Sequence, residues 1–217
     1  MVDALRANEE HRTLLANELN HRIKNTLATV QAIANQTLKD GVAMPDARAA
    51  FTARLMALSR AHDLLTEEQW VGADLVDVVR NAVAAFVAGG SDRIRMRGPP
   101  FRVSPRSALL LAMAVNELCT NAAKYGALST PKGRVDVSWQ IAVPKPGAEQ
   151  QLQMRWIESG GPPVMPPTRR GFGSRLIENV LAAELEGAVT VAYEPSGLTC
   201  TISMPLSGIQ EMKPHAA

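Results

Sequence analysis

The sequence predicts an α+β protein in two parts, an N-terminal α-hairpin followed by an α/β sandwich. Residues 3–38 contain no glycine or proline and carry apolar residues at helical spacing. After residue 72 the pattern changes to shorter helices that alternate with strand-like segments. The chain has 217 residues, of which 46% are hydrophobic and 20% are charged, so apolar material suffices for a core in each part.

The N-terminal part reads as two long helices joined by a short turn. The apolar stripe of the first helix comprises Leu15, Leu19, Ile23, Leu27, Val30, Ile33 and Ala34. Gly41 and Pro45 end this helix, and Asp46 can cap the second. The second helix has a heptad-like apolar seam comprising Phe51, Leu55, Leu58, His62 and Leu65. A second copy would bury these faces best, which favours a homodimer with a four-helix bundle; packing against the rest of the same chain is the alternative.

The second part combines helices with antiparallel strands. Helices are predicted at 74–87, 105–125 and 174–185, with Ser104 as the N-cap and Pro105 in the first turn of the middle helix. Strands are predicted at 93–97, 134–143, 151–157, 189–193 and 199–204. We therefore expect domains at 1–70 and 71–207, and an unstructured tail after Pro205 that includes 208–217.

Composition excludes several classes of protein. A formal net charge of +2 and an aromatic content of 4% argue against a nucleic-acid partner. Two distant cysteines, Cys119 and Cys200, exclude a disulfide scaffold and fit a reducing, cytoplasmic setting. No apolar run approaches the ~18 residues of a membrane span, and the first residues lack a signal-peptide core.

His21 is the candidate nucleophile of the first helix. It lies two residues from both Leu19 and Ile23, about 200° around the helix, and so faces away from the apolar stripe. A neutral imidazole in that position is a nucleophile near pH 7. A solvated surface histidine is the alternative. By contrast, His62 falls on the apolar seam, where packing is the default interpretation.

Three polar residues share one face at the end of the middle helix. Glu117, Asn121 and Lys124 stand at positions i, i+4 and i+7. Carboxylate and amide oxygens suit Mg²⁺ held together with substrate phosphates, and the lysine supplies charge for those phosphates. A polar stripe that simply faces solvent is the alternative.

Two later segments add possible ligand contacts. Glu158 ends a predicted strand and precedes Gly160, so a carboxylate and a close backbone approach occur together. Gly171 and Gly173 precede a predicted helix, whose free N–H groups suit phosphate. This turn is not a P-loop, because no lysine follows the glycines.

Taken together in this order, the segments resemble the HWE family of bacterial sensor histidine kinases over about residues 14–206. Residues 18–25 are similar to the phosphoacceptor box, which implies that His21 is phosphorylated. Residues 116–126 resemble the N-box of the Bergerat ATP-binding fold, in which Glu117 and Asn121 would serve Mg²⁺ and phosphotransfer. Trp156 and Glu158 match the W and E of the family name, with Glu158 at the adenine-reading position. Gly171 and Gly173 resemble the glycine box after a short ATP lid.

The sequence departs from the family pattern at one position. The histidine of the family name precedes the N-box glutamate, and here that residue is Asn116. Arg22 follows His21 where many histidine kinases carry an acid, as is typical of this family. Glu18, one turn earlier, is the candidate for orienting or deprotonating His21. Asn25, one turn later, stands where related kinases position the phosphate or a hydrolytic water.

The resemblance implies ATP-dependent autophosphorylation of His21 with Mg²⁺, followed by transfer to an aspartate of a response regulator protein. One alternative is a phosphotransfer or scaffold protein with a degenerate ATP domain. Another is a kinase for a serine on a partner protein. The sequence shows no input domain, so we expect sensing to occur in another protein or in an upstream sensor domain.

Overall fold

The computed structural model describes residues 2–38, 43–68, 70–87, 92–166, 176–177 and 181–209. The chain divides into two compact units, Met1–Leu55 and Met56–Ala217. The division falls within the second long helix, whereas the sequence predicts a boundary after residue 70. The expected functional domains, 1–70 and 71–207, stay a prediction.

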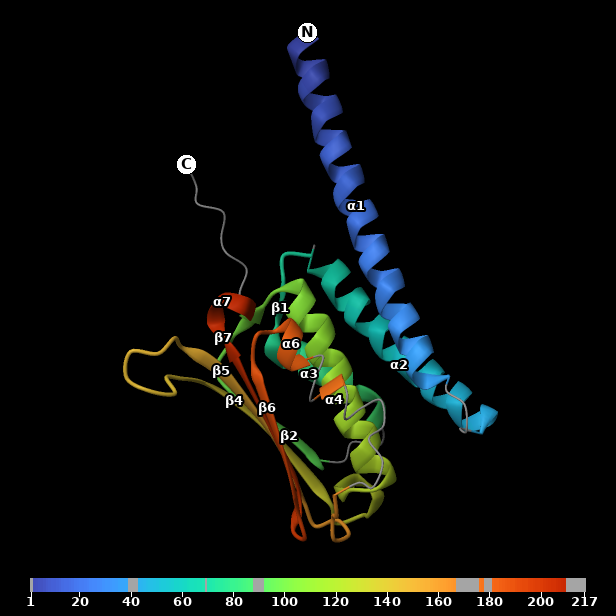
Figure 1. Cartoon of the computed structure of the whole chain (residues 1–217), viewed down its shortest axis with the longest axis vertical. Helices are drawn as coiled ribbons and strands as arrows, with labels where there is room; N and C mark the ends of the chain where they lie inside the picture. Colours follow the sequence, from blue (N-terminus) through green and yellow to red (C-terminus); the bar gives the residue numbers. More distant parts are fainter. Residues whose placement is uncertain are drawn as a thin grey trace. The chain divides into compact units, whose positions relative to one another are not determined.

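The first unit is helical, as predicted. Helix α1 spans Val2–Thr37, and helix α2, Met44–Glu67, begins in this unit (Figure 1). The two helices contact each other where Arg54 Nη1 donates to Thr37 Oγ1 at 2.8 Å. Ile33 and Ala47 are buried. Helix α2 starts before Asp46, which therefore lies in its first turn instead of capping it.

The second unit is built on a five-stranded sheet of order β2-β4-β5-β7-β6. Its strands are β2 (Ile94–Arg97), β4 (Arg134–Ala142), β5 (Gln151–Ser159), β6 (Ala188–Glu194) and β7 (Gly197–Pro205). Four of them pair antiparallel, as predicted. The β2–β4 pair is parallel, because the chain between the two strands crosses over through a helix. The sequence predicts antiparallel strands, and this pair is the exception.

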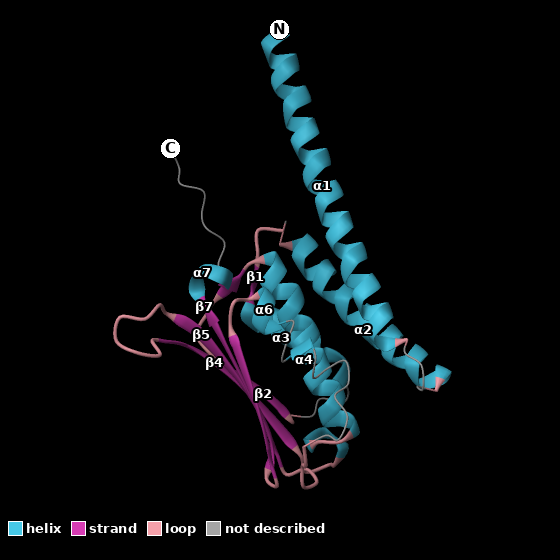
Figure 2. Cartoon of the chain, viewed as in Figure 1, coloured by secondary structure: helices cyan, strands magenta, loops and turns pink. Residues whose placement is uncertain are grey.

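Helices cover one face of this sheet. They are α3 (Leu75–Val83), which continues into the turn η1 (Ala84–Phe86), α4 (Pro105–Lys124) and α6 (Leu181–Glu184). Figure 2 shows all three α-helices on the same side of the strands. Ser104 caps α4 as predicted, since its side chain accepts from the Ser107 amide at 3.3 Å. Large side chains fill the space between the layers; they include Leu111, Leu152, Met154 and Trp156.

Three details were not predicted correctly or fully. Leu206–Ile209 form helix α7 where an unstructured tail was expected, because Ile209 is buried and its carbonyl accepts from the Ser104 amide at 2.7 Å. Residues 210–217 lie outside the described residues. Strands β1 (Ala73–Asp74) and β3 (Arg102–Val103) form a separate small sheet that the sequence did not reveal. Of the helix predicted at 174–185, the described residues include α6 and the buried pair Leu176 and Ile177.

No helix within the described ranges combines the length and apolar character that crossing a membrane requires.

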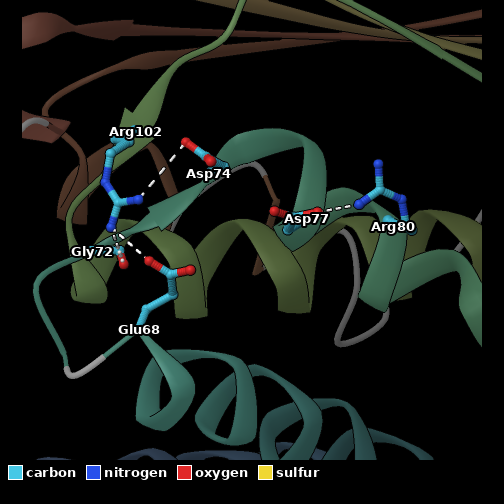
Figure 3. Close-up of polar contacts among 6 residues, drawn as sticks. All are labelled: Glu68, Gly72, Asp74, Asp77, Arg80 and Arg102. Carbon is cyan, nitrogen blue, oxygen red and sulfur yellow. Dashed lines mark hydrogen bonds and ion pairs between the residues drawn. The ribbon is translucent and has the colours of Figure 1, made fainter.

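The segment between α2 and α3 is held by Arg102 (Figure 3). The guanidinium donates to Glu68 Oε2 at 2.8 Å and to the Gly72 carbonyl at 3.0 Å. Its other terminal nitrogen, Nη1, lies 4.0 Å from Asp74 Oδ1. Arg102 therefore joins the end of α2 to the start of α3.

His62 and Trp70 make a second contact beside this segment. Their rings meet edge to face, with centroids 5.1 Å apart. Burial lowers the pKa of His62 against the opposing charge of Asp63. The packing role expected of His62 is consistent with this contact.

We expect Arg102→Ala to lower the free energy of unfolding by about 1 kcal/mol, because an exposed ion pair and a backbone hydrogen bond are lost together. Urea unfolding measures the change. Arg80→Ala is the matched control: it removes an exposed ion pair with Asp77 on α3 and should cost less than about 0.5 kcal/mol. Equal losses for the two variants would contradict the role given to Arg102.

Candidate active site

Helix α4 carries the predicted phosphate-binding residues along one face. Glu117 is only 4% exposed, Asn121 is half-buried and Lys124 is exposed. The stripe thus passes from the interior of the unit to its surface. A stripe that merely faces solvent would not bury its first carboxylate, so the burial of Glu117 favours a built site over that alternative.

Glu158 lies at the end of β5 and is 5% exposed. Its Oε2 accepts from the Ala127 amide at 2.8 Å, and its Oε1 accepts from the Trp156 indole nitrogen at 3.1 Å. Ala127 is the third residue after α4 and begins the short turn η2 (Ala127–Ser129). The carboxylate therefore ties the strand to the end of the helix that bears Glu117 and Asn121. One further lone pair on each oxygen leaves capacity for a ligand donor.

The electrostatics of this corner follow from burial. Burial raises the pKa of Glu158, while the hydrogen bonds from Ala127 and Trp156 oppose that rise. The Cys119 thiol is also buried, and burial together with the nearby Glu158 carboxylate raises its pKa. Cys119 is thus an inert thiol packed against the site.

Glycines allow the close approach around Glu158. A Cβ at Gly126 would overlap Glu158 Oε2, and a Cβ at Gly161 would lie 2.6 Å from the Ala127 Cα. Gly160 has a φ of +70°, and its carbonyl accepts from Thr130 Oγ1 at 3.1 Å. A side chain at any of these positions would disturb the joint between β5 and η2.

The remaining predicted residues are described only in part. Asn25 lies on α1 and is exposed. His21 and Glu18 belong to the same helix, but their side chains lie outside the described residues. Gly171 and Gly173 also lie outside the described residues. Their predicted roles stay predictions.

The sequence interpretation missed the partners of Glu158. It assigned Gly126 only to the end of a helix and did not consider the Ala127 amide. One signal was present: residues two apart in a strand share a face, so the Trp156 indole lies on the same side as the Glu158 carboxylate. The contact with Ala127 joins residues 31 positions apart, and no local pattern encodes it.

The donor set of α4 fits a magnesium–nucleotide complex. Within the described ranges, no three His, Cys, Asp or Glu side chains gather into a metal cluster. Mg²⁺ bound with substrate phosphates needs only one or two protein oxygens, which Glu117 and Asn121 can supply. Lys124 is exposed on the same helix, and its ammonium could supply charge for phosphate.

Comparisons with known proteins agree with this reading of the fold. The HWE histidine kinase family model matches residues 18–100. A blue-light-activated histidine kinase of Brucella ovis is 44% identical over 199 residues, which is 92% of this chain and 40% of that relative. The histidine kinase domain of the Erythrobacter litoralis EL346 blue-light activated histidine kinase aligns with 86% of this chain and 95% of its own, at 19% identity and a TM-score of 0.53. A longer structure of the EL346 protein aligns with 88% of this chain and 58% of its own, at 20% identity and a TM-score of 0.59.

The fold is therefore that of the protein histidine kinases. Within that class, residues 18–100 belong to the HWE histidine kinase family, and the family assignment made from the motifs is confirmed. The chain spans about 40% of the length of the curated relatives it matches.

Gly126→Ala should lower the free energy of unfolding by about 1–3 kcal/mol, because the new methyl group displaces the Glu158 carboxylate from its two donors. Chemical denaturation measures the loss. Gly208→Ala on α7 is the control, since a Cβ there meets only ordinary contacts of 3.4 Å or more. Equal losses for the two variants would contradict the close contact between Gly126 and the Glu158 carboxylate.

The raised pKa of Glu158 predicts a pH-dependent contribution to stability. A folded-state pKa above the unfolded value means that this contribution is present below the ordinary pKa of 4.5 and is lost as pH rises through the folded pKa. We therefore expect the unfolding free energy of wild type minus that of Glu158→Gln to fall from pH 5 to pH 8.

Glu149→Gln is the control for this measurement. Hydrogen bonds donated by Ser207 lower the pKa of Glu149, so this carboxyl titrates below its ordinary value of 4.5. The difference between wild type and this variant should stay constant from pH 5 to pH 8. A difference for Glu158→Gln that grows with pH would show that the carboxylate is preferentially ionised in the folded protein.

Proposed function

We propose that this chain is the catalytic core of a two-component sensor histidine kinase, which transfers the γ-phosphoryl group of ATP to His21 and then to an aspartate of a response regulator. The family match over residues 18–100 includes His21 and supports the proposal. The observation that carries it is the buried Glu117 on α4, one turn before Asn121 and on the helix that Glu158 anchors.

The nucleotide would lie against α4 and the end of β5. Glu117 and Asn121 would hold Mg²⁺ and the phosphates, and Lys124 would offset negative charge on them. Glu158 and Gly160 would contact the adenine end, and Gly171 and Gly173 would close the phosphate side. When bound, Mg²⁺ neutralises charge on the phosphate oxygens.

His21 accepts the γ-phosphoryl group of ATP. A lone pair on a neutral imidazole nitrogen forms the new N–P bond while the bond from the γ-phosphorus to its bridging oxygen breaks, which releases ADP. Glu18, one turn earlier on α1, would orient the ring or accept its proton, and Asn25, one turn later, would position the phosphoryl group. An aspartate carboxylate of the response regulator then takes the phosphoryl group and restores the imidazole.

A homodimer would complete the N-terminal part. Leu19, Ile23 and Leu27 follow one another by one turn on α1 and are 60%, 47% and 62% exposed. Exposed apolar side chains at helical spacing favour burial against a partner helix. We propose a second copy of this chain as that partner, in a four-helix bundle of two hairpins.

Incubation with radiolabelled ATP and Mg²⁺ tests the proposed reaction. Wild type should acquire label that survives alkali and is lost in acid, whereas His21→Ala and Asn121→Ala should stay unlabelled. His11→Ala, which removes another histidine of α1, is the matched control and should label like wild type. Label restored by mixing the two inactive variants would place the transfer between subunits of a dimer.

Two outcomes would contradict this proposal. Acid-stable label on His21→Ala would indicate a kinase for hydroxyl side chains. An unlabelled wild type that millimolar ATP–Mg²⁺ also fails to stabilise against heat would indicate a phosphate relay with a degenerate ATP domain.

A further inference from the structure

Arg60 of α2 reaches the residue that precedes Glu117. Its Nη2 donates to Asn116 Oδ1 at 3.5 Å, across 56 positions of the sequence. Both residues belong to the unit Met56–Ala217. Asn116 is only 3% exposed and Arg60 is half-buried, so this hydrogen bond is partly buried. The contact joins α2 directly to the helix that carries the candidate phosphate-binding residues.

The surroundings of Arg60 are otherwise mainly apolar. A small cavity beside it is lined mainly by alanines of α2, α3 and α4, with Asn81 as the other polar residue; the alanines are Ala57, Ala61, Ala82, Ala108 and Ala112. Among the residues that the structure describes, the buried Nε of Arg60 has no hydrogen-bond partner. A guanidinium with only part of its hydrogen bonds made, beside an apolar cavity, contributes little to stability. A role in positioning its partner Asn116 accounts better for its placement.

Asn116 is a residue of α4, so the hydrogen bond from Arg60 restrains that helix. Its backbone carbonyl accepts from Thr120 Oγ1 at 2.8 Å, while its side chain accepts from Arg60. Both ends of the residue are therefore held. Glu117 is the next residue and is also buried, so a rotation or slide of α4 at Asn116 would move the Glu117 carboxylate with it.

We propose that Arg60 is a positioning residue, which holds Glu117 at its place in the phosphate-transfer site through the side chain of Asn116. This inference rests on the proposed histidine kinase function. Helix α2 begins in the first unit and ends in the second. Arg60 lies in the part of α2 that belongs to the second unit, and it links that part to α4, which carries Glu117. Position 116 then requires a hydrogen-bond acceptor. A neutral imidazole satisfies that requirement as an amide oxygen does.

Autophosphorylation of the full chain with radiolabelled ATP and Mg²⁺ tests this role. Arg60→Ala and Asn116→Ala should each lower the rate constant at saturating ATP by roughly 10- to 100-fold, as small misplacements of a catalytic group do. The half-saturating ATP concentration should change less than the rate constant does, since neither side chain is itself assigned to ATP. The double variant should be no slower than the slower single variant, because both substitutions remove one interaction.

Further variants separate positioning from general loss of structure. Asn116→His keeps an acceptor and should retain a rate close to wild type. Arg80→Ala removes an exposed arginine of α3 and should leave the rate unchanged. Binding of a fluorescent ATP analogue checks the fold of each variant; should Arg60→Ala fail to bind, Arg60→Lys replaces it, because lysine keeps the charge and the stem but lacks the planar fork.

The outcomes are distinguishable. A labelled wild type with an equally fast Arg60→Ala, or with losses that multiply in the double variant, would overturn this inference and leave the proposed function intact. A wild type that never acquires label would overturn the proposed function and this inference with it.

Discussion

The hydrogen bond from the Ala127 amide to the Glu158 carboxylate is the constraint on which the rest of the site depends. It joins the end of α4 to the end of β5 at 2.8 Å, and the Trp156 indole fixes the second carboxylate oxygen. Gly126 and Gly161 permit this approach, since a side chain at either position would push the joint apart. Glu117 and Asn121 take their position from a helix that is anchored in this way. A shift of the joint would therefore move the whole proposed phosphate-binding face.

The same arrangement has a cost in stability. Burial raises the pKa of Glu158, so keeping its carboxylate ionised near neutral pH costs free energy. Arg60 is a second case, because its buried Nε lacks a partner among the described residues. Ionisable groups placed at such cost concentrate at functional sites. Here Arg60 contacts Asn116 in the middle of α4, and Glu158 contacts Ala127 just beyond the end of that helix. The core between sheet and helices compensates with large, fully buried apolar side chains.

Local patterns in the sequence predicted most of the elements. The absence of glycine and proline from 3–38 gave α1, and the Ser104-Pro105 start gave α4, because propensity and capping act within a few residues. The parallel pairing of β2 with β4 and the burial of Ile209 were missed, since both depend on contacts between distant segments. At the site, the spacing of Glu117, Asn121 and Lys124 was readable from helix geometry. The bonds from Ala127 to Glu158 and from Arg60 to Asn116 were not, because they join residues 31 and 56 positions apart.

Hydrogen exchange of the Ala127 amide tests the central constraint most directly. If the Glu158 carboxylate holds this amide, it should exchange in wild type only with extensive unfolding of the unit, and replacing Glu158 with alanine should speed its exchange by roughly 10-fold or more, the equivalent of about 1.4 kcal/mol. Amides in the middle of β7 should change far less. An Ala127 amide that exchanges at the same rate in both proteins would contradict the account, because the carboxylate would then not be what joins α4 to β5.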